Sequence, residues 1–185
     1  ELDAQGADIE DVQTKLDTAE RRSLDIDGIE PLVSENFFEV DINSIDPDTK
    51  AQEYTLSITG AVESDVSFDY EELTEMESVN KFSTLRCVGD SLNGEKIDTA
   101  LWTGVPLQRL VERAGVQSDC DCVLLKAEDG YEVEFPMAAF NRGLAVYGMN
   151  GRKLPRGHGY PVRAMIPGHW GEVNTKWIDG IEVLQ

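Results

Sequence analysis

The sequence predicts an α+β domain in which short helices flank a mainly antiparallel or mixed β-sheet. Its strand patterns come in hairpin-like runs, without the regular strand–helix alternation of parallel sheets. Its helical patterns are few and short. The 185 residues are enough for one domain with a sizeable core.

The N-terminal part predicts a helix and an extended arm. Ile9, Val12, Leu16 and Ala19 recur at helical spacing, and this helix is expected to end near Arg21-Arg22. The mixed acidic residues that follow suggest an extended or disordered arm. We therefore divide the chain into residues 1–35, an N-terminal helix and arm, and residues 36–185, the main domain.

The first half of the main domain predicts strands and two short helices. Residues 54–60 alternate apolar and polar side chains, which indicates a half-buried strand. Residues 67–73 begin with capping residues followed by acids, which indicates a short helix. The Cys87 strand and its glycine-bearing loop come next. Residues 103–106 are expected to open a helix whose buried face is Leu107, Leu110, Val111 and Ala114 and which Gly115 ends.

The second half predicts mostly strands. Residues 122–126 and 131–135 flank Asp129-Gly130, which indicates a hairpin. A short helical turn is expected after Pro136, then a strand at 144–147 and a turn at Asn150-Gly151. Strands at 160–166 and 175–184 complete the expected sheet.

The chain is strongly acidic, with a formal net charge of -20. Residues 1–80 hold 23 acidic and 4 basic residues, whereas residues 81–185 hold 13 and 12. This balance argues against a nucleic-acid partner, which needs a basic face. It is typical of a halophilic protein, with an acidic interaction tail as the alternative. No stretch approaches the roughly 18 apolar residues of a membrane span.

The three cysteines do not form a disulfide framework or a zinc cluster. Cys120 and Cys122 are read as incidental. Cys87 follows an apolar-tending run and Arg86 and precedes a glycine loop. By itself this setting fits a soft metal ligand, a nucleophile or a buried packing residue.

A basic window follows in the last third of the chain. Between residues 141 and 176, six Lys or Arg side chains and both histidines are opposed only by Glu172. One interpretation is a patch that neutralises the acidic N-terminal half. The other is an anion pocket, because Arg and Lys bind phosphate oxygens through charge-assisted hydrogen bonds. Gly168 and Gly171 favour the pocket, since they let backbone N–H groups approach a ligand closely.

An ordered series of motifs resembles the molybdenum-cofactor-binding domain of the sulfite-oxidase-fold oxidoreductases. The resemblance covers roughly residues 36–185 and lies in these segments: Leu85-Arg86-Cys87-Val88-Gly89-Asp90, Leu101-Trp102-Thr103-Gly104-Val105-Pro106-Leu107, Asp129-Gly130-Tyr131, Tyr147-Gly148-Met149-Asn150-Gly151, Leu154-Pro155, His158-Gly159-Tyr160-Pro161-Val162-Arg163, Pro167-Gly168, Gly171 and Lys176-Trp177-Ile178. Any one segment is a weak signal, but their order is specific. The resemblance implies the sulfite-oxidase molybdopterin-binding fold.

The resemblance also implies a site. Cys87 would be the thiolate ligand of molybdenum, which suits a soft sulfur donor, with Arg86 favouring the thiolate. Tyr147 would lie over the metal as a second catalytic residue. The pterin and its phosphate would be bound by Arg86, His158, Arg163, Asn174, Thr175 and Lys176.

The implied function is molybdopterin-dependent oxygen-atom transfer to or from a small oxo acceptor or donor, with single electrons exchanged with an unidentified electron-transfer partner. Sulfite oxidases carry an arginine-containing segment that helps to hold the anionic substrate. At the corresponding place, residues 36–42 of this chain carry acids instead, which argues against sulfite as the substrate. A carrier or assembly module that binds molybdopterin is the alternative. A third hypothesis is a cysteine-nucleophile enzyme, with Cys87 activated by His158 or His169. We expect the protein to lie outside the cytoplasm, tethered to the membrane through a preceding segment.

Overall fold

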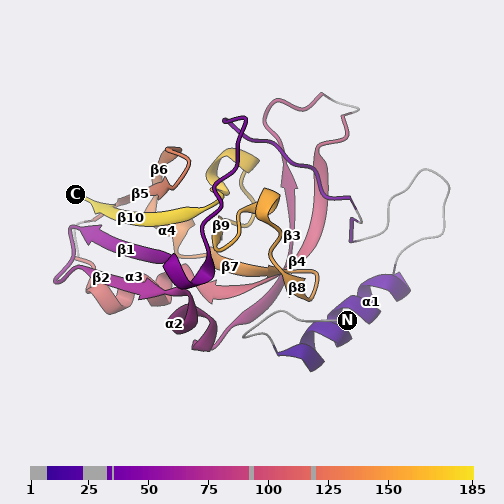
Figure 1. Cartoon of the computed structure of the whole chain (residues 1–185), viewed down its shortest axis with the longest axis horizontal. Coiled ribbons are helices and arrows are strands. Elements are labelled where there is room, and N and C mark those ends of the chain that lie inside the picture. Colours follow the sequence, from indigo (N-terminus) through magenta and orange to yellow (C-terminus); the bar gives the residue numbers. More distant parts are fainter. Residues whose placement is uncertain (1–7, 23–32, 35, 92–93, 118–119) are drawn as a thin grey trace.

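The computed structural model describes residues 8–22, 33–34, 36–91, 94–117 and 120–185. Two five-stranded sheets dominate this part of the chain (Figure 1). The first sheet has the order β2-β1-β10-β5-β6, with strands β1 (Thr55–Gly60), β2 (Val66–Asp69), β5 (Cys122–Ala127), β6 (Glu132–Pro136) and β10 (Ile178–Leu184). The second has the order β3-β4-β7-β8, with β9 also on β7: β3 (Val79–Arg86), β4 (Ile97–Pro106), β7 (Leu144–Met149), β8 (Arg152–Lys153) and β9 (Arg163–Met165).

The first sheet is mixed, as the hairpin-like patterns predict. Strand β1 pairs with β10 in parallel, with Ile58 opposite Ile181, and the other pairs are antiparallel. Residues of β1 alternate between a buried and a more exposed face, and Ile58 and Ile181 have no exposed surface. The predicted strand at 54–60 and the hairpin at 122–135 are therefore confirmed.

The second sheet corrects one prediction. Residues 103–106 do not open a helix but form the end of β4, and the helix begins at Leu107. The register shifts between Thr103 and Gly104, where the chain passes very close to β7: a Cβ on Gly104 would lie 2.2 Å from the Ala145 carbonyl oxygen. Glycine is therefore required at this position of the strand, because the two backbones approach closely there. From the sequence alone, the same residues resemble the start of a helix.

The short helices flank the sheets. Helix α3 (Leu107–Ala114) buries the four predicted apolar residues, and Gly115 caps it with φ 73°. Helix α4 (Met137–Phe140) follows Pro136 as expected. The helix predicted at 67–73 is α2 (Tyr70–Glu75). Residues 67–69 belong to β2, and Asp69 is the N-cap of the helix, in a capping box with Glu72.

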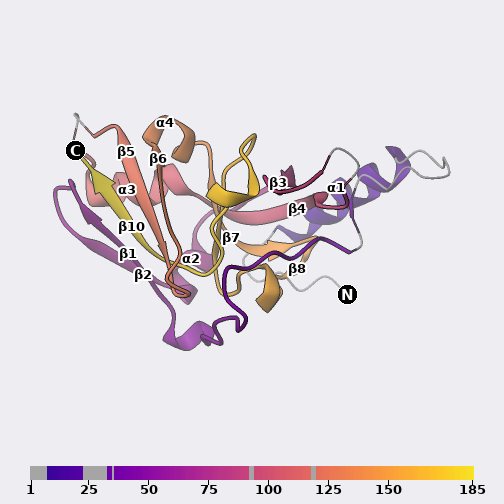
Figure 2. The same ribbon diagram turned by 90° about the horizontal axis from the view of Figure 1, so that it is seen from above.

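Helix α1 (Ile9–Arg22) matches the predicted N-terminal helix. Val12 and Ala19 are buried, and the Asp11 carboxylate accepts a 2.7 Å hydrogen bond from Asn80 at the second sheet. Figure 2 shows α1 alongside β3 and β4. The arm predicted up to residue 35 falls largely outside the described residues. No helix in the described part of the chain is long and apolar enough to cross a membrane.

The C-terminal strands are shorter than predicted, since β9 covers only three residues of 160–166 and β10 starts at Ile178. The predicted turn is confirmed, with Asn150 and Gly151 at φ 51° and 73°. A segment without regular structure, residues 36–50, joins the two sheets (Figure 1). The Phe38 N–H donates to Asp98 in β4 (2.7 Å), and Asn43 donates to the Asp129 carbonyl in the β5–β6 turn (2.8 Å).

Candidate functional site

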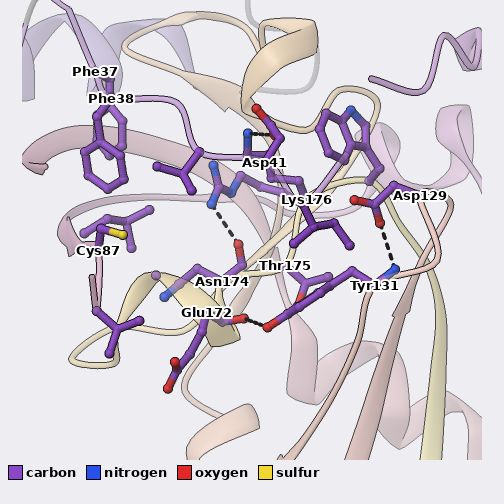
Figure 3. A pocket seen from close by; sticks show the side chains of 17 residues that line it. Phe37, Phe38, Asp41, Cys87, Asp129, Tyr131, Glu172, Asn174, Thr175 and Lys176 are labelled. Atoms are coloured by element: carbon purple, nitrogen blue, oxygen red, sulfur yellow. Dashed lines mark hydrogen bonds and ion pairs between the residues drawn. The ribbon is translucent and has the colours of Figure 1, made fainter. Parts of the chain in front are cut away.

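A pocket of about 290 Å³ lies where the two sheets meet (Figure 3). Four parts of the chain line it: residues 37–42, the end of β3 with the loop after it, the β5–β6 turn, and the segment at 171–177 that leads into β10. Arg163 of β9 completes the lining. These parts are far apart in sequence, so the pocket forms only when both sheets are assembled.

Cys87 enters the pocket because β3 ends at Arg86. The Cys87 N–H still donates to the Lys96 carbonyl (3.0 Å), and the Asp90 N–H donates to the Cys87 carbonyl (3.1 Å), which turns the chain. The thiol is partly exposed and is not disulfide-bonded. Gly171 packs against this turn: a Cβ there would lie 3.3 Å from the Arg86 carbonyl oxygen and 3.8 Å from the Cys87 Cα. The predicted glycine loop therefore supports the backbone of Cys87.

Arg163 is the buried cation of the site, with 3% of its surface exposed. One terminal nitrogen donates to the His158 carbonyl (3.0 Å) and the other to the Asn174 carbonyl (2.8 Å). Its guanidinium lies 5.2 Å from the Trp102 ring centroid. Burial lowers the pKa of Arg163 to about 10, so the side chain remains protonated at neutral pH.

Lys176 is the second cation that lines the pocket. Its Nζ donates to the Asp41 carboxylate and to the Gly157 carbonyl. The Lys176 and Asp41 side chains are only 13% and 21% exposed. The Asp41 carboxylate, from the segment at 36–50, thus neutralises a lysine that the motifs assign to cofactor binding.

His158 lies behind these cations. Burial, and then the charges of Arg163 and Lys176, lower its pKa to about 4, so the imidazole is neutral at pH 7. Its Nε2 is 3.5 Å from a Glu39 carboxylate oxygen, and its ring packs edge-on against Phe37 at 5.6 Å. His158 itself does not line the pocket.

Three buried polar atoms near the pocket have no hydrogen-bond partner among the described residues: His158 Nδ1, Arg163 Nε and Thr175 Oγ1. Buried polar groups are usually satisfied, so such a cluster fits a site that a polar ligand completes. The Asn174 side chain is different. Its Oδ1 accepts from the Ile166 N–H (2.6 Å), and its Nδ2 donates to the Trp170 carbonyl (2.8 Å), which holds the glycine loop in place.

The structure brings most of the predicted site residues together. Five line the pocket: Cys87, Arg163, Asn174, Thr175 and Lys176. Arg86 and Tyr147 do not. The Arg86 guanidinium lies 5.2 Å from the Trp170 ring centroid, outside the pocket lining. Tyr147 is 1% exposed and packs edge-on against Tyr70 at 6.4 Å, and burial raises its pKa.

The motifs predict no role for several lining residues. Phe37, Phe38 and Asp41 come from the segment at 36–42, whose acids depart from the sulfite-oxidase pattern. Asp129 and Tyr131 belong to the Asp129-Gly130-Tyr131 motif, but that motif does not predict that they line a pocket. The Tyr131 hydroxyl donates to the Glu172 carbonyl (2.9 Å), which ties the β5–β6 turn to the glycine loop.

Two further features bear on the chemistry of the site. In the described part of the chain, Cys87 makes no hydrogen bond to either histidine, so the geometry does not support a cysteine–histidine nucleophile. Within the same residues, no group of three His, Cys, Asp or Glu side chains gathers closely enough to hold a metal ion.

Comparisons with known proteins give a consistent result. A model of the family described as the oxidoreductase molybdopterin binding domain matches residues 42–185. The NADH nitrate reductase of Spinacia oleracea is 29% identical over 167 residues, covering 74% of this chain and 18% of that protein. The uncharacterized oxidoreductase YuiH of Bacillus subtilis is 27% identical over 131 residues, covering 70% of this chain and 64% of that protein.

Two other matches extend the comparison. The sulfite oxidase of Arabidopsis thaliana is 25% identical over 166 residues, covering 72% of this chain and 42% of that protein. Among solved structures, the sulfane dehydrogenase SoxCD of Paracoccus pantotrophus shares the fold, with a TM-score of 0.71 over 92% of this chain and 52% of that one, at 21% identity. The chain spans less than two thirds of the length of each of these proteins.

Proposed function

Because this chain belongs to the oxidoreductase molybdopterin-binding domain family, we propose that it is a molybdenum-cofactor-dependent oxidoreductase that transfers an oxygen atom to or from a small molecule. The family agrees with the resemblance inferred from the ordered motifs. The observation that supports the site assignment is one pocket that combines a free thiol, a buried arginine and a lysine.

The residues fit a phosphorylated pterin that holds a metal. Arg163 and Lys176 offer two positive charges of the kind that bind phosphate oxygens. The unsatisfied atoms of His158, Arg163 and Thr175 offer further hydrogen-bonding capacity. Neutral His158 adds no positive charge, but either of its ring nitrogens can serve as an acceptor or a donor.

Each residue has a distinct part in the proposed mechanism. The Cys87 thiolate would be the protein ligand of the metal, because soft sulfur donors suit it. Lys176 and Arg163 would hold the phosphate and the pterin, with the backbone at 174–176 contributing. When bound, the cofactor supplies the oxygen-atom transfer and the two-electron redox chemistry, while the protein places it and excludes water. Phe37 and Phe38 stack on each other and give the pocket that Cys87 lines an apolar surface.

The proposal gives Arg86 and Tyr147 no direct role. Arg86 contacts Trp170, Tyr147 contacts Tyr70, and neither side chain lines the pocket. An external one-electron partner would supply or accept the electrons.

The test is a pair of cysteine variants purified from a host that makes the cofactor. Cys87→Ser is expected to retain the pterin but to lose turnover with artificial electron donors and acceptors. Cys122→Ser is the matched control, because Cys122 is a partly exposed free cysteine that is not part of the pocket lining. An active Cys87→Ser variant would refute the ligand assignment, and a loaded but inactive wild-type protein would favour the carrier alternative.

A further inference from the structure

We propose that a second cavity, separate from the pocket that contains Cys87, binds an alkylammonium or guanidinium group. This group comes either from a basic side chain of a partner protein or from a free organic amine. The inference rests on three features of the cavity: a buried tyrosine hydroxyl without a hydrogen-bond partner among the described residues, an aromatic face on which a cation lies, and two carboxylates.

The cavity has a volume of about 390 Å³ and lies beside helix α2. Four parts of the chain line it: a short 3-10 helix (Ala51–Glu53), the junction of β2 and α2, strand β8, and the loop that precedes β9. None of its lining residues belongs to the pocket that contains Cys87. The proposed function therefore makes no use of this cavity.

Tyr70 brings a polar atom to the cavity from a buried position. Only 6% of its surface is exposed, and its ring packs edge-on against Tyr147 at 6.4 Å and against Tyr160 at 5.9 Å. In the described part of the chain, no hydrogen bond engages the Tyr70 hydroxyl. Burial raises the pKa of Tyr70, so the hydroxyl stays protonated at neutral pH. Because buried polar groups are usually satisfied, this oxygen is suited to accept a hydrogen bond from a ligand N–H group.

The face of Tyr160 shows where a ligand cation would lie. The Lys153 Nζ is 4.0 Å from the centroid of the Tyr160 ring, and both residues line the cavity. The negative face of an aromatic ring attracts ammonium and guanidinium groups. Lys153 is exposed and its stem is flexible, so a ligand cation can displace it from the ring. The chain thus displays, with its own lysine, the contact that we expect of the ligand.

Two carboxylates complete the lining. Asp69 and Glu71 flank Tyr70 in the sequence and line the cavity with it. The Asp69 Oδ1 accepts the Glu72 N–H (2.8 Å), which caps α2. Glu71 is exposed and makes no ion pair within the described ranges, so its carboxylate is available to a ligand. A cation that binds here gains a charge-assisted hydrogen bond, which is stronger than one between neutral groups.

The other basic residues near the cavity are paired elsewhere. Lys50, which directly precedes the 3-10 helix, lies 2.8 Å from an Asp48 carboxylate oxygen. Arg156 lies 3.7 Å from the other oxygen of Asp48 and donates to the Pro47 carbonyl (2.8 Å). Neither side chain lines the cavity. Among the described lining residues, Lys153 is therefore the only basic side chain that faces the two carboxylates.

The cavity suits an organic cation better than a metal ion. Within the described residues, no group of three His, Cys, Asp or Glu side chains lies close enough together to hold a metal ion. Ca²⁺ takes roughly six to eight oxygen ligands, which two carboxylates and a phenol do not supply. An ammonium or guanidinium group needs only a few acceptors and an aromatic face.

The experiment measures binding of N-acetylarginine amide to the full chain by calorimetry. N-acetylcitrulline amide is the control ligand, because it has nearly the same shape and no charge. Three variants test the cavity: Glu71→Gln removes a carboxylate, Tyr70→Phe removes the hydroxyl but keeps the ring, and Lys153→Met removes the competing cation. Glu75→Gln is the matched control, because Glu75 is an exposed acid of the same helix that does not line the cavity.

The wild-type protein is expected to bind the arginine derivative about tenfold more tightly than the citrulline derivative, the effect of one charge-assisted hydrogen bond. Glu71→Gln should weaken binding about tenfold and Tyr70→Phe about threefold, whereas Lys153→Met should tighten it about threefold and Glu75→Gln should leave it unchanged. Equal binding of the two ligands would overturn the inference. Equal weakening by Glu71→Gln and Glu75→Gln would also overturn it, because the effect would then be one of net charge.

Two further ligands distinguish the sources of the cation. One is a glycine pentapeptide with a central arginine, and the other is agmatine, a free guanidinium amine. Tighter binding of the peptide supports a basic side chain of a partner protein, and tighter binding of agmatine supports a free amine. Binding of neither would overturn the inference.

Discussion

The contact between Asp41 and Lys176 makes a sharp prediction about cofactor loading. The Asp41 carboxylate neutralises Lys176 in a setting where the lysine and aspartate side chains are 13% and 21% exposed. A phosphate group that binds Lys176 must therefore replace Asp41. Asp41→Asn removes the competing charge and keeps the side-chain size, so we expect the variant to bind phosphate more tightly than the wild-type protein.

The magnitude follows from the partial burial of the pair. At an effective dielectric constant of about 20, two unit charges about 4 Å apart attract by about 4 kcal/mol. Desolvation and the ordering of the lysine side chain cancel much of this, so the net value falls to about 1–2 kcal/mol, between those of exposed and buried pairs. The free energy of unfolding should fall by about this amount without phosphate, and phosphate affinity should rise about tenfold.

The assay is a thermal-shift titration of cofactor-free protein with phosphate at constant ionic strength, because a ligand that binds only the folded state stabilises it by RT ln(1 + [L]/Kd), where [L] is the free phosphate concentration. Asp48→Asn is the control. It removes the same charge from an exposed carboxylate that pairs with Lys50 and Arg156. If both variants raise phosphate affinity equally, the effect is one of net charge, and the competition at Lys176 is refuted.

Three further predictions concern His158, Gly104 and Arg163. The His158 pKa is about 4 in the folded protein, against an ordinary histidine value of 6.5. The stability that His158 contributes is therefore fully present above pH 6.5 and is lost as the pH falls toward 4. After allowance for solvent screening, the loss amounts to about 2 kcal/mol, and His158→Asn should remove this part of the pH dependence in chemical-denaturation curves. Gly104→Ala places a Cβ 2.2 Å from a backbone oxygen and should lower the free energy of unfolding, measured in urea, by about 3 kcal/mol. The control is Gly180→Ala, whose Cβ has its nearest contact at 3.2 Å to a side chain and which should cost under about 1 kcal/mol. Equal costs for the two variants would contradict the close approach at Gly104. Arg163→Lys keeps the positive charge but loses the pair of hydrogen bonds to two backbone carbonyls, so we expect the free energy of unfolding to fall by about 2–3 kcal/mol. An unchanged melting temperature would show that these two hydrogen bonds are dispensable for stability.

Local patterns predicted most of the elements because their physical causes are local. The alternation in β1, the buried face of α3 and the φ 73° of Gly115 all follow from a few consecutive residues. The end of β4 was missed for a different reason. Gly104 is needed there by the backbone of β7, about 40 residues further along the chain, and no local pattern contains that contact.

The site was predictable to the extent that motifs name its residues. Cys87, Arg163 and Lys176 were identified from the motifs, and they meet in one pocket. The partner of Lys176 was not predicted, because Asp41 lies 135 residues earlier and the pairing depends on the path of the segment at 36–50. The motif that contains Tyr147 does not predict how its side chain packs. In the structure the side chain lies against Tyr70 within the core.

The central claim is that this pocket holds molybdenum through Cys87, and metal analysis combined with X-ray absorption tests it most directly. Protein purified from a cofactor-competent host is expected to contain about one molybdenum per chain, with a sulfur ligand that disappears in Cys87→Ser while the pterin remains. The same sulfur coordination in wild-type and Cys87→Ser protein would contradict the assignment. Absence of both metal and pterin from the wild-type protein would contradict the proposed enzyme function.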